Sequence, residues 1–86
     1  MEDVKMVRVI GIEHRKYTSK KTGKEVEGYN VYVEEPLDGV KGAEGVRTWA
    51  EWFSPEMFKD SDIALGVVGS ISYNRYGRVE RFIIAG

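Results

Sequence analysis

The chain has 86 residues, 13 basic against 14 acidic residues, a net charge of −1 at pH 7 and no cysteine. This length suits one domain with a single core, which we predict to span residues 1–86, and apolar runs of only a few residues exclude a membrane-spanning helix. Without cysteine there is no disulfide framework, thiolate metal site or cysteine nucleophile, and the composition fits a reducing compartment, so we expect a cytoplasmic protein.

The first predicted strand covers residues 4–17. Its apolar residues occupy both parities, which predicts burial on both faces; they are Val4, Met6, Ile10 and Ile12 on one parity and Val7 and Val9 on the other. Gly11 marks a bulge or bend in this strand. A long, bent first strand is what the two halves of a small barrel share.

A turn at residues 19–24 leads into a return strand at residues 25–35, and Gly23 supplies the residue that best tolerates positive φ. Tyr29 is expected to face the core and Tyr32 the solvent. Residues 14–24 hold five cations and no acid. Because cations bind phosphates and flat rings stack on bases, the hairpin predicts a nucleic-acid surface. Its candidate residues are Arg15, Lys16, Tyr17, Lys20, Lys21, Lys24, Tyr29 and Tyr32. The alternatives are a solvated loop for the cations and cross-strand packing for the rings.

Residues 36–45 form an acidic, turn-rich loop, and residues 46–53 form the third predicted strand. Trp49 lies between Arg47 and Glu51, so we place it outward, where it either stacks on bases or packs, and we place Trp52 inward. Large aromatic residues are usually core, and this is the expectation for Trp52, Phe53, Phe58 and Phe82.

A short helix is predicted to begin after Ser54, with Pro55 in its first turn, and to end near residue 61. Residues 67–74 and 78–84 form the last two strands around a tight turn. Arg75, Tyr76 and Arg78 in that turn are candidates for contact with phosphates and bases, or else solvated and packed residues. Five strands with a helix between the third and fourth indicate an all-β, five-stranded OB-fold-like Greek-key barrel, with an SH3-like barrel as the alternative.

Two hairpins resemble those of the filamentous-phage single-stranded DNA-binding (helix-destabilising) proteins and related small OB-fold replication proteins of phages and mobile elements. The first hairpin contains Gly23-Lys24 and a tyrosine soon after, and the second reads SISYNRYGRVER at residues 70–81. The resemblance implies a homodimer that binds single-stranded DNA, with RNA as the alternative, without sequence preference. It also implies a role in replication or transfer of a phage or mobile element. The first hairpin would be the DNA-binding wing, and Tyr76 would reach DNA from the partner subunit. The acidic loop and the Trp-rich third strand depart from that family.

Other functions have less support from the residues. His14 is the only histidine, no serine lies in a G-x-S-x-G motif, and Glu56, Asp60 and Asp62 lack EF-hand spacing. We therefore expect neither an enzyme nor a metal or cofactor. One alternative is a protein-interaction module that presents Tyr32, Trp49 and Phe53, with the basic hairpin on an acidic tail. Another is a carbohydrate-binding barrel that uses the same aromatic residues.

Overall fold

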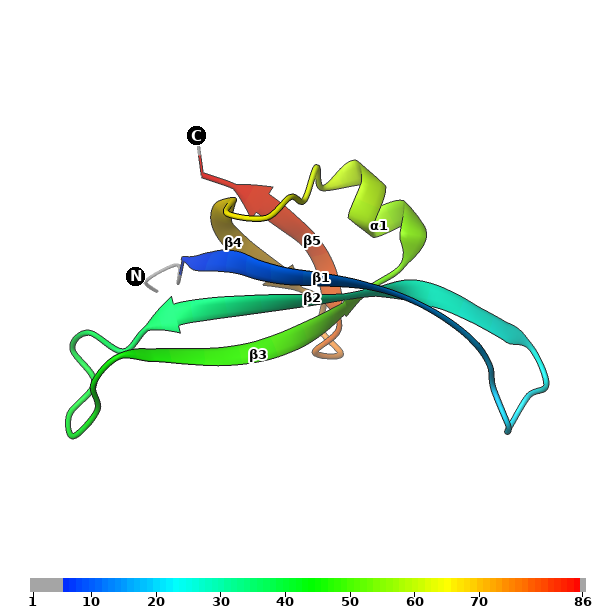
Figure 1. Cartoon of the computed structure of the whole chain (residues 1–86), viewed down its shortest axis with the longest axis horizontal. Coiled ribbons are helices and arrows are strands. Elements are labelled where there is room, and N and C mark those ends of the chain that lie inside the picture. Colours follow the sequence, from blue (N-terminus) through cyan, green and yellow to red (C-terminus); the bar gives the residue numbers. More distant parts are fainter. Residues whose placement is uncertain (1–5, 86) are drawn as a thin grey trace.

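The computed structural model describes residues 6–85 as one antiparallel sheet with a single helix (Figure 1). The elements are β1 (Val7–Thr18), β2 (Glu25–Pro36), β3 (Val46–Phe53), α1 (Pro55–Asp60), β4 (Val68–Tyr73) and β5 (Val79–Ile84). Their order in the sheet is β3-β2-β1-β4-β5. The predicted architecture of five strands with a short helix between the third and fourth is confirmed. The sheet is not closed between β3 and β5, so the molecule is a barrel only in a loose sense.

The first strand links the two halves of the sheet. β1 pairs with β2 along most of its length and with β4 through Val7 and Arg8. The register with β2 shifts between Val9 and Gly11, which confirms the predicted bulge. Because of this extra residue, Val7 and Val9 face the core before the bulge and Ile12 packs against it afterwards.

The prediction that the first strand is buried on both faces is wrong. Met6 and Ile10 are 40% and 45% exposed, whereas Val7 and Val9 are buried. Val4 lies outside the described residues. The reason is that α1 and the β4–β5 hairpin supply the core on one side of β1, β2 and β3. We call that side the inner face and the opposite side the outer face.

The core lies between the inner face, the β4–β5 hairpin and the segment that follows α1. Its buried residues are Val7, Val9, Val31, Val33, Phe53, Ile63, Val79 and Phe82. Phe53 and Phe82 therefore have the core positions expected of them. Tyr29 and Phe58 are half-buried and pack against this cluster, as does Met57.

The helix forms as its sequence predicts. Ser54 is the N-cap, its Oγ accepting a hydrogen bond from the backbone N–H of Met57 at 3.2 Å, and Pro55 occupies the first turn. No helix in the described part of the chain has the length and apolar character needed to cross a membrane.

The two tryptophans of β3 have the reverse of their predicted orientations. The β2–β3 register places Trp49 opposite Val33 and Phe53 opposite Tyr29, so odd-numbered residues of β3 face inward. Trp52 points outward and is 38% exposed, whereas Trp49 packs against the core. Two polar neighbours of Trp49 suggested solvent, but both have partners on the inner side of β3. Glu51 accepts hydrogen bonds from Trp49 Nε1 and the Tyr73 hydroxyl, and Arg47 pairs with buried Glu35 at 3.1 Å.

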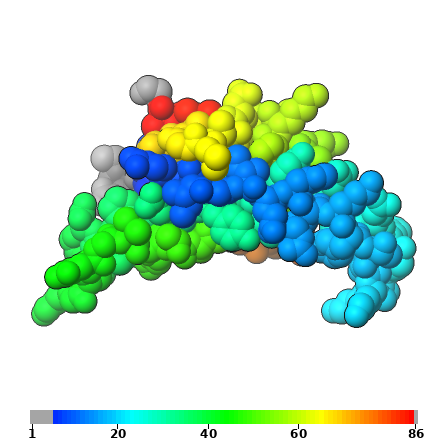
Figure 2. All heavy atoms as spheres, in the orientation of Figure 1, coloured from blue at the N-terminus to red at the C-terminus, as the bar shows by residue number. Residues whose placement is uncertain are grey.

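The molecule is elongated and arched, with extents of 45 × 29 × 27 Å. Figure 2 shows that the β1–β2 turn at one end and the loop after β2 at the other bend toward the same side. The hollow between them lies on the side of the sheet away from α1 (Figure 1).

Candidate nucleic-acid interface

Three lysines surround the tip of the β1–β2 hairpin. Hydrogen bonds from Ser19 N–H to the Lys24 carbonyl and from Gly23 N–H to the Ser19 carbonyl, both 2.8 Å, close the turn. Gly23 has a φ of +71°, in keeping with its predicted role. Within residues 6–85, no carboxylate forms an ion pair with Lys20, Lys21 or Lys24. We call these three residues the lysine tip; their charges are available to an anionic ligand.

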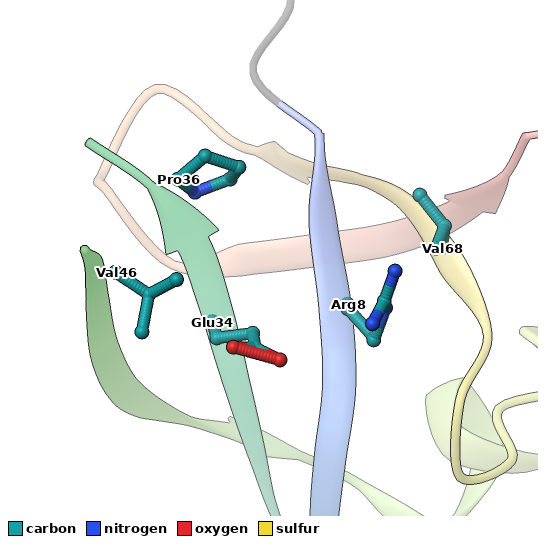
Figure 3. A pocket seen from close by; sticks show the side chains of 5 residues that line it. All are labelled: Arg8, Glu34, Pro36, Val46 and Val68. Carbon is teal, nitrogen blue, oxygen red and sulfur yellow. The ribbon is translucent and has the colours of Figure 1, made fainter. Parts of the chain in front are cut away.

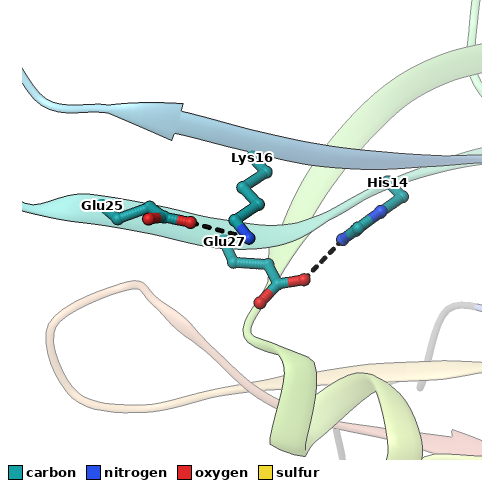
Figure 4. Close-up of polar contacts among 4 residues, drawn as sticks. All are labelled: His14, Lys16, Glu25 and Glu27. Carbon is teal, nitrogen blue, oxygen red and sulfur yellow. Dashed lines mark hydrogen bonds and ion pairs between the residues drawn. The ribbon is translucent and has the colours of Figure 1, made fainter.

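The other predicted cations of the hairpin have acidic partners. Lys16 pairs with Glu25 at 2.8 Å on the inner face of the hairpin (Figure 4). On the same face His14, which was not among the predicted cations, contacts Glu27 at 2.7 Å. Arg15 lies 3.7 Å from Glu13 on the outer face. Among residues 6–85 the sequence cluster therefore divides into lysines without an ion-pair partner at the tip and paired residues along the arms. Such pairs between half-exposed groups are weak, so a phosphate can compete for Lys16 and Arg15.

Three exposed rings form a row on the outer face. The strand register places Tyr17, Trp52 and Tyr32 on this side, running from the lysine tip toward the middle of the sheet. They are 49%, 38% and 39% exposed, and for Tyr32 this confirms the predicted exposure. Tyr17 meets Trp52 edge-on, with ring centroids 6.5 Å apart. We call these three residues the ring face.

Two glycines let these rings lie close to the sheet. The Trp52 indole lies directly over Gly28, where an added Cβ would overlap the ring, and Tyr32 lies over Gly11, where a Cβ would be 3.3 Å from the ring. A side chain at either position would push the ring away from the backbone. Each ring therefore has one side against the sheet, and its exposed area is on the side that a base can reach.

A carboxylate holds Tyr32, the tyrosine of this row that lies nearest the middle of the sheet. Glu13 Oε1 accepts hydrogen bonds from Asn30 Nδ2 at 3.3 Å and from the Tyr32 hydroxyl at 3.2 Å. The Asn30 amide, with smaller contributions from Tyr32 and Arg15, lowers the pKa of Glu13 below its ordinary value. Glu13 is thus ionised at neutral pH, where it orients Tyr32 and Arg15 while also repelling phosphate.

Two of the rings predicted for the site lie on the opposite face. Tyr29 stacks on Phe58 of α1, with centroids 3.9 Å apart and planes 11° apart, and its other neighbour is His14 at 4.9 Å. Trp49 donates to Glu51 on the inner side of β3, where both residues are half-buried. Neither residue joins the ring face. Trp52, which the sequence assigned to the core, is instead part of the ring face. Gly28 could have indicated this, because a glycine in the middle of a strand often marks a site where a neighbouring ring approaches the backbone closely.

The remaining candidates lie in the β4–β5 turn. Asn74 Oδ1 accepts from the backbone N–H of Tyr76 at 2.9 Å and of Arg78 at 3.1 Å, which shapes the turn. The Arg75 guanidinium lies 6.0 Å from the centroid of the Tyr76 ring, and Tyr76 is 78% exposed. In the described part of the chain neither Arg75 nor Arg78 has an ion-pair partner.

The far end of the sheet carries a different kind of surface. Arg8, Glu34, Pro36, Val46 and Val68 line an open cavity of about 250 Å³ (Figure 3). One cation and one carboxylate face each other across neighbouring strands there, and the described lining contains neither a nucleophile nor an aromatic ring. Among residues 6–85 no group of three His, Cys, Asp or Glu side chains is close enough to hold a metal ion.

Comparison with family models, curated proteins and solved structures finds no match for this chain. The surfaces described above are the basis for a function, and in them the lysine tip lies beside the ring face.

Proposed function

We propose that this protein binds single-stranded DNA without sequence preference, through the ring face and the lysine tip. The observation that carries the proposal is that a row of exposed rings on the hairpin and β3 leads to three lysines for which residues 6–85 supply no acidic partner. Every base has a flat face that can stack, whereas the lysines bind the backbone. Neither contact depends on the identity of the base.

The expected strength follows from the number of contacts. Removing one stacked ring typically costs about 1 to 3 kcal/mol of binding free energy. Each phosphate contact steepens the salt dependence of single-strand binding by about 0.7 in log K against log salt. Two or three rings and three lysines can thus bind a strand usefully, although the net charge of the whole chain is −1.

The resemblance of the two hairpins to filamentous-phage single-stranded DNA-binding proteins supports DNA as the polymer. It also supports a homodimer and a role in replication or transfer of a phage or mobile element. Paired bases in a duplex cannot stack on protein rings, so the ring face suits an unpaired strand.

The test is a titration with oligo(dT) at several salt concentrations, with a duplex of equal length and an RNA strand of the same length for comparison. The variant Lys20→Gln with Lys21→Gln should lower the salt slope by about 1.4, because two phosphate contacts are lost. Its matched control, Lys41→Gln with Lys59→Gln, removes the same charge elsewhere and should keep the slope.

An equal loss of slope in both double variants would show that only net charge matters and would contradict a site at the hairpin. Binding to poly-glutamate, with no response to DNA or RNA at low salt, would instead assign the lysine tip to an acidic protein partner. Such a protein partner could not bind a single surface made of Tyr32, Trp49 and Phe53, because Phe53 is fully buried.

A further inference from the structure

A groove lies at the open edge of β3 beside the ring face, and inward-facing residues such as Glu51 and Met57 line it together with Trp52. Trp52, on β3, lines one side of an open groove of about 440 Å³, and Asn74, Gly77 and Arg78, in the β4–β5 turn, line it as well. β3 and β5 approach each other here without pairing, since the sheet is open between them. The groove therefore lies where the lack of strand pairing leaves space beside an exposed indole.

The indole in this groove is held in place from two sides. Gly28 lets it lie directly on β2, and Tyr17 meets it edge-on at 6.5 Å. Tyr17 also connects the groove to the basic hairpin, because it lies on β1 near the lysine tip. A ring fixed in this way loses little conformational freedom when a base stacks on it.

The turn supplies polar groups of the right kind. Asn74 Oδ1 is occupied by two backbone N–H groups, and within residues 6–85 its Nδ2 donates no hydrogen bond, so that nitrogen is the group left to donate. Arg78 is exposed and has no ion-pair partner among the described residues. Glu51 also lines the groove, but its Oε2 already accepts from Trp49 and Tyr73.

We propose that this groove holds one nucleotide of the bound strand. Its base stacks against the Trp52 indole, a polar edge of the base accepts from Asn74 Nδ2, and its phosphate binds the Arg78 guanidinium. The inference rests on the proposed function and extends it. It assigns Trp52 to the ligand and makes the β4–β5 turn a second contact that acts together with the hairpin of the same subunit.

The two tryptophans allow a direct test. In Trp49→Phe the only indole is Trp52, and oligo(dT) should quench its fluorescence, whereas in Trp52→Phe the remaining Trp49 should respond little. Trp52→Leu keeps an apolar cover on Gly28 and should weaken oligo(dT) binding by about 5- to 150-fold, the loss expected for one stacked ring. Circular dichroism establishes whether Trp52→Leu is folded.

Two arginines of the second hairpin form a matched pair. Arg78→Gln, in the β4–β5 turn, should lower the salt slope by about 0.7. Arg81→Gln removes the same charge from β5, outside the groove, and should leave the slope unchanged. If Trp52→Leu fails to fold, this pair of variants and the Trp49→Phe titration still test whether the groove binds the strand.

One combination of results would contradict the proposed nucleotide site in the groove. Wild type would bind oligo(dT), and this binding would require Lys20 and Lys21. Trp52 fluorescence would nevertheless stay constant, and Arg78→Gln would behave like Arg81→Gln. The hairpin would then be the whole site. If wild type binds no single strand at any salt concentration, the proposed function and the groove are both overturned.

Discussion

The two faces of the β1–β2 hairpin carry similar residues but differ in what contacts them. On the inner face, Tyr29 stacks on Phe58 of α1, and Lys16 and His14 pair with glutamates of the neighbouring strand. On the outer face, Tyr17 and Tyr32 are exposed, and no helix covers them. Residue type alone therefore does not distinguish a structural ring from a binding ring. The difference is whether the protein itself supplies a partner.

This contrast predicts that inner-face substitutions cost stability and outer-face substitutions cost binding. The largest effect should come from Phe53→Ala, because Phe53 is fully buried in the core. We expect a loss of about 3 to 5 kcal/mol in the free energy of unfolding. Urea denaturation measures it, with Tyr32→Ala as the outer-face control, and a loss below about 1 kcal/mol would contradict the assigned core.

Tyr32→Ala should have the next largest effect, on affinity rather than on stability. We expect binding to oligo(dT) to weaken by about 1 to 3 kcal/mol, since a ring that stacks on a base is lost. Tyr32→Phe keeps the ring but loses the hydrogen bond to Glu13, so it should retain most of the affinity. If the phenylalanine variant binds as weakly as the alanine variant, the hydroxyl rather than stacking accounts for the contact.

Tyr73→Phe tests the hydrogen bonds near the interior that join β3 to β4. Burial, together with the hydrogen bond to Glu51, raises the pKa of Tyr73 to about 12. A tyrosine in the unfolded chain ionises near its ordinary pKa of about 10, so the stabilisation is complete below that pH and is lost as pH rises toward the folded value. Urea midpoints between these two values should fall with pH more steeply in wild type than in Tyr73→Phe. Parallel curves would contradict the role of Tyr73.

Glu13→Gln should give the smallest effect, with the opposite sign. Glutamine can still accept from Asn30 and Tyr32, but it no longer repels phosphate or pairs with Arg15. Affinity for oligo(dT) at low salt should rise by about 1.5- to fivefold, the range for one exposed charge pair. Weaker binding would show that the carboxylate matters more for positioning Arg15 than for repulsion.

Much of the fold could be predicted because its signals are local. Ser54 and Pro55 indicated the helix start, Gly11 the bulge, and Gly23 the hairpin turn, and each depends on neighbouring residues only. The number of strands and the place of the helix between the third and fourth followed from the same kind of local signal. These parts needed no knowledge of which strands pair.

The orientation of β3 and the ion-pair partners of the hairpin cations could not be predicted without knowing which strands pair and in which register. Trp49 and Trp52 lie on opposite parities, and only the register with β2 shows which parity faces the core. Lys16 looked free because the acid that pairs with it, Glu25, comes after the turn. Trp52 was missed for the same reason, since its contact with Gly28 joins two strands.

The measurement that tests the central claim most directly is mapping of backbone and indole N–H signals by NMR during titration with oligo(dT). The account predicts shifts for the outer-face residues Tyr17, Gly28 and Tyr32, for the lysine tip and for the Trp52 indole N–H. The Trp49 indole N–H and the backbone around Val31 should stay unchanged. Shifts concentrated on the inner face, or at Trp49 instead of Trp52, would contradict the assignment of binding to the outer face.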